Sequence, residues 1–176
     1  PKQAINEKKR EIGCIAIGTK SDLLFGQGCL NVGEVMSPPL IRQVKALIDP
    51  KQSVIIDAPP GTSCPVISAI KGSDLCLLVT EPTPFGLNDL VLAVAMVREL
   101  GLPFGVIINR ADLGDNNTQV YCAKENIPIL MEIPFNKEIA KAYAQGLPLV
   151  QILPEYIQKF KTLFSQINLI IGKENK

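Results

Sequence analysis

Short, continuously apolar runs constrain the fold of this chain more than any other feature. Leu75–Val79 and Val106–Ile108 contain no charged residue, whereas a strand with one solvent-exposed face alternates apolar and polar side chains. Such runs are typical of parallel strands buried between two layers of helices, and stretches with helical periodicity separate them here. We therefore predict an α/β fold with a doubly wound, mostly parallel sheet.

The expected elements alternate between strand and helix after an N-terminal pair of strands joined by a turn at Lys20 and Ser21. The strands are expected at 11–17, 23–30, 53–57, 75–80, 104–109 and 127–133. The helices are expected at 37–48, 65–70, 87–100, 117–125, 136–144 and 155–170, with Gly101 ending the third. A length of 176 residues suits a single domain.

Composition excludes several functional classes. The formal net charge is +1 and no basic cluster is present, which argues against nucleic acid as the main partner. The 5 cysteines include no C-x-x-C pair and histidine is absent, so the sequence predicts neither a zinc site nor a local iron–sulfur motif. No apolar run is long enough for a membrane span and the first residues do not resemble a signal peptide. These features favour a cytoplasmic location with reduced thiols.

Asp57 ends an apolar run and is followed by a Pro-Pro-Gly turn. A carboxylate at the end of a buried parallel strand is the Walker-B position of P-loop NTPases, where it holds the metal of a bound nucleotide. An ordinary strand end would show the same pattern. The phosphate-binding loop G-x-x-x-x-G-K-[ST] is not found in the 176 residues, and Gly13–Ser21 only imitates it because Thr19 replaces the lysine.

Ligands of doubly wound proteins bind outside the carboxyl ends of the strands. This rule selects three segments: 57–62, 80–85, and Asn109 with Arg110. We predict that all three lie at one edge of the sheet.

Several motifs together resemble one family. The runs are VIIDAPPGTSCPV at 54–66, LLVTEPTPFGLNDL at 77–90, GVIINR at 105–110 and IPF at 133–135. They resemble the MinD/ParA-like (Mrp-related) P-loop ATPases of the branch with an inserted ferredoxin domain, over about residues 4–150. The resemblance implies a P-loop NTPase-like fold from which the P-loop strand is missing here. It also implies that this chain corresponds to the C-terminal part of such a protein.

The resemblance assigns roles to particular residues. Asp57 would bind Mg²⁺ through water, and the backbone amide of Gly61 would sense a γ-phosphate. Asn109 would read adenine, Arg110 would stack on the base, and Pro134 would contact it through the neighbouring backbone. The structural alternatives are that Asn109 caps a turn, Arg110 covers the sheet end and Pro134 ends a strand. Glu34 and Glu81, the other nearby acids, are expected to be solvated loop charges.

The implied cofactors are ATP or ADP and Mg²⁺. The implied 4Fe-4S clusters would lie only in an upstream ferredoxin part, of which residues 1–10 would be the tail, because Pro1–Ile5 resembles the end of a cluster ligand run. The leading hypothesis is an ATP-driven switch linked to iron–sulfur or metallocluster handling, with negligible hydrolysis by this chain alone. Its partners would be a nucleotide and a second copy or an iron–sulfur or metalloprotein. The alternative is a ferredoxin-linked electron-transfer protein in which this domain is a scaffold.

Overall fold

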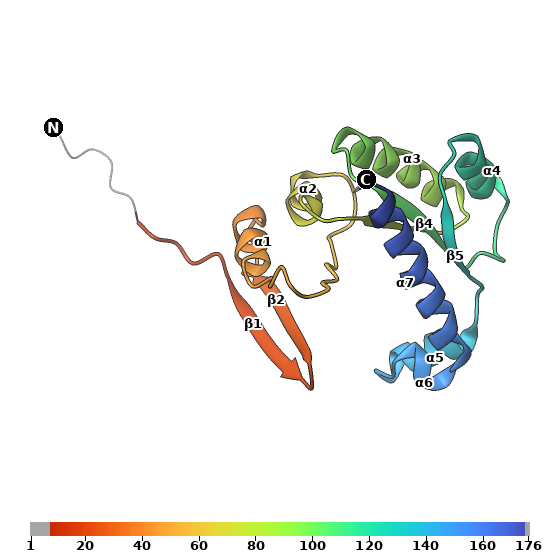
Figure 1. Cartoon of the computed structure of the whole chain (residues 1–176). Coiled ribbons are helices and arrows are strands. Elements are labelled where there is room, and N and C mark those ends of the chain that lie inside the picture. Colours follow the sequence, from red (N-terminus) through yellow and green to blue (C-terminus); the bar gives the residue numbers. More distant parts are fainter. Residues whose placement is uncertain (1–7, 175–176) are drawn as a thin grey trace. The chain divides into compact units, whose positions relative to one another are not determined.

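The computed structural model describes residues 8–174 (Figure 1). The chain separates into two compact units, residues 1–71 and 72–176. Each unit is described by itself, and the organisation as one domain stays a prediction.

The second unit contains a parallel sheet of three strands in the order β3-β4-β5. The strands are β3 (Cys76–Thr80), β4 (Phe104–Asn109) and β5 (Ile129–Ile133), so β4 is central. The prediction for β4 is confirmed residue for residue. The strand expected at 127–133 begins two residues later, because Ile127 and Pro128 still belong to the connection from the preceding helix.

Helices cover both faces of this sheet, as the apolar strands predict. On one face, Val106 and Ile108 of β4 are fully buried against α3 (Pro84–Glu99) and α4 (Asn117–Lys124). On the other face, Ile107 packs against α7 (Glu155–Glu174), which passes in front of the strands in Figure 1. The predicted α/β, doubly wound architecture is therefore confirmed for this unit.

The ends of α3 follow from local chemistry. Thr83 caps the N-terminus, since its hydroxyl accepts a hydrogen bond from the Gly86 amide at 3.0 Å, and Pro84 occupies the first turn. The helix therefore begins three residues before the predicted start at 87. At the other end Gly101 has φ +63°, and Leu102 donates to the Val97 carbonyl, a Schellman motif. The prediction that Gly101 ends this helix is confirmed.

The C-terminal region consists of α5 (Lys137–Ala144), the short α6 (Leu149–Ile152) and α7. The helix α6 was not predicted from the sequence. Tyr156 and Leu163 of α7 are buried on the sheet, whereas Phe164 is 55% exposed. None of the helices in residues 8–174 is long and apolar enough to cross a membrane.

The first unit contains an antiparallel hairpin of β1 (Gly13–Lys20) and β2 (Leu23–Leu30), followed by α1 (Pro38–Lys45) and α2 (Cys64–Ile70). Lys20 pairs with Leu23, so Ser21 and Asp22 form the turn, and Ser21 adopts φ +52°. α1 packs over the glycines of β2 and contacts α2. The turn predicted at Lys20 and Ser21 thus lies where the two strands reverse.

The strand predicted at 53–57 is wrong. Residues 53–59 adopt no regular secondary structure, and Ile55 is 98% exposed. An apolar run becomes a strand only when a neighbour satisfies its backbone donors and acceptors, and no strand pairs with this segment in the described part of the chain.

Candidate functional site

The candidate site is the edge of the second unit where β3 and β4 end. Thr80 pairs with Ile108, so Glu81, which follows β3, lies beside Asn109, the last residue of β4. The Arg110 guanidinium lies 3.4 Å from the Glu81 carboxylate, with both side chains partly exposed. Glu81 was expected to be a solvated loop charge; it is partly exposed in the loop after β3, and its carboxylate also pairs with a predicted site residue.

Arg110 turns the chain at the end of β4. It adopts φ +52°, an uncommon conformation for a residue with a Cβ atom. The turn is held by hydrogen bonds of 2.9 Å from the Leu113 amide to the Arg110 carbonyl and from the Ala111 amide to the Ile133 carbonyl. These bonds place the Arg110 backbone at the strand end, and its side chain is 53% exposed.

Asn109 is half-buried, and its side-chain amide makes no hydrogen bond to any residue of the described chain. It pairs with Ile133, so Pro134 begins the adjacent loop. The Asp112 carboxylate accepts a hydrogen bond from the Phe135 amide and ties that loop to the one after β4. Three predicted residues therefore meet at one edge of the sheet: Asn109, Arg110 and Pro134. The side-chain amide of Asn109 has both its donor and its acceptor available to a ligand.

Thr80 is a structural member of this edge that was not among the residues predicted from the sequence. Its side chain is buried, and its hydroxyl donates to the Gly86 carbonyl at 2.9 Å. This bond joins the end of β3 to the first turn of α3. A threonine that ends an apolar strand just before a Pro-rich loop was the available signal.

Asp57 and Gly61 belong to the first unit. Asp57 is exposed in the irregular segment, and Gly61 is exposed with φ +90° and open space around its Cα. The conformation alone requires glycine here. The loop leads into α2, whose end is held by the Lys45 ammonium through the carbonyls of Ser68 (3.3 Å), Ala69 (2.8 Å) and Lys71 (2.7 Å). That Asp57 and Gly61 share a site with Asn109 stays a prediction.

Glu34 is not the solvated loop charge that the sequence analysis expected. Its side chain is 5% exposed and pairs with Arg10. The backbone amides of Met36 and Val35 donate to its carboxylate, both at 3.0 Å. The Met36 amide is the main cause of the lowered pKa of Glu34, and the Arg10 charge adds to it. Glu34 therefore organises the loop before α1.

The polar groups at this edge of the second unit are the open Asn109 amide and the planar Arg110 guanidinium. An open amide and a planar guanidinium suit a purine, while the 176 residues contain no lysine-bearing phosphate loop. Within residues 8–174, no group of three or more His, Cys, Asp or Glu could hold a metal ion. Mg²⁺ needs only one or two carboxylates beside phosphates and water, so the role of Asp57 stays a prediction.

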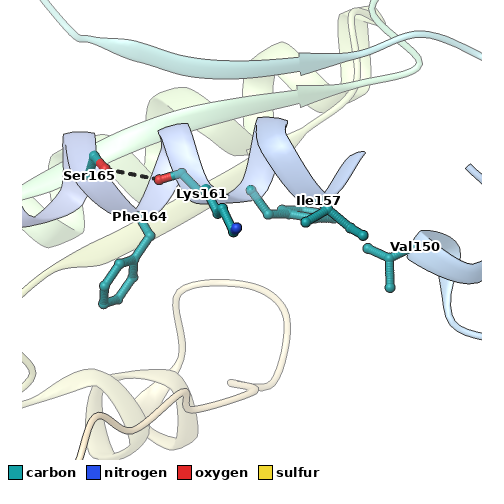
Figure 2. A pocket seen from close by; sticks show the side chains of 6 residues that line it. Val150, Ile157, Lys161, Phe164 and Ser165 are labelled. Carbon is teal, nitrogen blue, oxygen red and sulfur yellow. Dashed lines mark hydrogen bonds between the residues drawn. The ribbon is translucent and has the colours of Figure 1, made fainter. Parts of the chain in front are cut away.

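A hollow of about 580 Å³ lies on the outer side of α7 (Figure 2). It is lined mainly by apolar side chains, including Val150, Ile157 and Phe164, with Lys161 as its charged residue. The Ser165 hydroxyl donates to the Lys161 carbonyl at 3.0 Å and is therefore occupied. The residues that line this hollow include no carboxylate and no side-chain amide.

No protein-family model matches the chain. An uncharacterized protein of Methanocaldococcus jannaschii is 29% identical over 144 residues, which is 81% of this chain and 46% of the relative. An "Iron-sulfur cluster carrier protein" of Rickettsia bellii is 33% identical over 111 residues, 61% of this chain and 35% of the relative. An "Uncharacterized ATP-binding protein" of M. jannaschii is 28% identical over 122 residues, 67% of this chain and 46% of the relative. The chain thus spans less than half of each of these three proteins.

Proposed function

We propose that this chain is the base-binding and switch part of an ATP-dependent protein that handles iron–sulfur clusters. The observation that supports it best is the open Asn109 amide beside Arg110 and Pro134 at the carboxyl end of the central strand. Ligands of doubly wound proteins bind at such an edge. The similarity to proteins named as an iron–sulfur cluster carrier and as ATP-binding supports the same assignment.

The three residues divide base recognition between them. The Asn109 amide donates to one adenine nitrogen and accepts from the exocyclic amine. Arg110 stacks its guanidinium on the ring, and Glu81 holds that guanidinium in position through the 3.4 Å ion pair. Pro134 and the backbone that follows β5 close the edge of the base.

Asp57 and Gly61 supply the phosphate-sensing part of the proposal. The Asp57 carboxylate holds water around a bound Mg²⁺, and the Gly61 amide donates to a γ-phosphate oxygen. Loss of that phosphate frees the loop 58–63 to rearrange, which changes the surface offered to a second copy or to a client metalloprotein. The lysine and the amide cradle for the phosphates come from outside these 176 residues, so this chain alone hydrolyses ATP negligibly.

The test is the affinity of the complete gene product for Mg²⁺·ATP, measured by calorimetry. Asp57→Asn is expected to weaken binding when Mg²⁺ is present and to change little when Mg²⁺ is chelated. Asp74→Asn is the matched control, because Asp74 is also exposed but precedes β3. Equal affinities for wild type and Asp57→Asn in Mg²⁺ would contradict the switch and favour the electron-transfer scaffold.

A further inference from the structure

Cys14 and Cys29 are direct cross-strand neighbours in the hairpin of the first unit. Both are exposed, and neither forms a disulfide. They lie 15 positions apart in the sequence, so no C-x-x-C pattern reveals them. Facing residues of an antiparallel pair project from the same face, and the two thiols therefore form a pair.

This thiol pair lies on the free face of the hairpin. A Cβ atom at Gly28 would stand 2.9 Å from a methyl group of Val44, so the Gly28 face is the one against α1. Cys29 follows Gly28, and successive side chains of a strand point to opposite faces. The thiols are therefore open to solvent and are not needed for the packing of α1.

The register also sets the separation of the two side chains. The Asn31 amide donates to the Ile12 carbonyl at 2.9 Å, and hydrogen-bonded pairs alternate along an antiparallel ladder. Cys14 and Cys29 then occupy a position of the ladder at which the two backbones are hydrogen-bonded to each other. At such a position the Cα atoms are about 5.5 Å apart, and the Cβ atoms lie near the upper end of their usual separation of about 4.5–5.5 Å. A disulfide needs Cβ atoms only about 3.5–4.5 Å apart. The pair is better suited to holding an atom between its sulfurs.

The residues beside the two thiols limit which metal ion the pair can bind. The next pair on this face is Ala16 with Gln27, so no carboxylate that would favour a hard cation flanks the thiols. Structural zinc sites and iron–sulfur clusters take four protein ligands and catalytic zinc sites take three, whereas the pair provides two. We propose that Cys14 and Cys29 bind one soft monovalent cation of the Cu(I) class per chain through two thiolates.

The binding step is balanced without electron transfer. Each thiol loses its proton to solvent, and each sulfur forms one bond to the metal. Close strand contact keeps the pair in register, because a Cβ atom at Gly13 would stand 2.2 Å from the Cys29 carbonyl oxygen. The site is independent of the proposed nucleotide function.

The test titrates the reduced chain with Cu(I), without oxygen, in competition with the chromophoric chelator bicinchoninate. Wild type is expected to withhold one equivalent from the chelator, and Cys14→Ser or Cys29→Ser to lose this capacity. Cys64→Ser is the matched control, since Cys64 is also exposed in the same unit but has no cross-strand partner. It should bind as wild type does.

Two results of the titration would overturn the proposal. One is equal Cu(I) retention by wild type and the Cys14→Ser, Cys29→Ser double variant, with circular dichroism showing both folded. The other is loss of retention in Cys64→Ser. X-ray absorption of the loaded chain should show two sulfur ligands per copper, and three or more would also contradict the two-thiolate site.

Discussion

Gly114 and Pro82 are in close contact across the loops that follow β4 and β3. A Cβ atom at Gly114 would stand 1.9 Å from the Pro82 carbonyl oxygen, and Gly114 has φ +93°. Pro82 is fully buried. This contact joins the loops that carry Glu81 and Arg110, so the geometry of the candidate site depends on a glycine that is not itself one of the predicted site residues.

Gly114→Ala should therefore destabilise the chain through both its backbone conformation and the clash. Gly72→Ala is the matched control, because Gly72 also has positive φ but has nothing within 4 Å of the added Cβ. We expect the free energy of unfolding, from denaturant titration, to fall by about 1–3 kcal/mol more in Gly114→Ala. Equal losses would mean that the Pro82 contact is not tight.

Gly13→Ala should destabilise the hairpin because its Cβ would overlap the backbone of β2. Gly18 lies in the same strand with open space around it, so Gly18→Ala should be neutral or stabilising by up to about 1 kcal/mol. Thermal unfolding of the two variants beside wild type tests this. The same melting temperature for both would contradict the proposed strand contact.

Lys45→Met should loosen the end of α2, because the three carbonyls held by the ammonium would lose their donor. Hydrogen bonds to charged groups contribute roughly 1.5–3 kcal/mol, and we expect a loss of that order. Faster amide exchange in 64–71 would localise the effect. Arg42→Met in the same helix is the control, since Arg42 is exposed, and matching exchange rates would contradict the role of Lys45.

The free energy of unfolding should depend on pH through the protonation of Glu34. Its pKa in the folded chain is lowered from the ordinary value of a glutamate, chiefly because the Met36 amide donates to the carboxylate. The stabilisation is therefore present above the unfolded-state pKa and is lost as the pH falls through the folded-state pKa. The difference in unfolding free energy between wild type and Glu34→Gln should shrink when the pH is lowered from 7 to 3. A difference independent of pH would contradict this.

Local sequence patterns were sufficient to predict the elements whose structure depends on a single segment of the chain. β4 was predicted because a continuous apolar run follows the helix-ending Gly101, and the edge with Asn109, Arg110 and Pro134 follows from parallel strand order. Features that depend on a second segment were missed or wrong. The run at 53–57 resembled a strand but has no pairing partner in the described residues.

Pairing also explains the other omissions. The Cys14–Cys29 pair needs the hairpin register, which follows only once Ser21 and Asp22 are recognised as the whole turn. Glu34 was taken for a solvated charge because backbone amides of the next two residues leave no sequence signal.

The most direct test of the account is base recognition by Asn109. In the complete gene product, Asn109→Ala should weaken ATP binding by about 1–3 kcal/mol and leave tripolyphosphate binding unchanged, because the amide contacts only the base. Asn168→Ala, at an exposed asparagine of α7, should change neither affinity. Unchanged ATP affinity in Asn109→Ala, or equal losses for ATP and tripolyphosphate, would contradict the central claim.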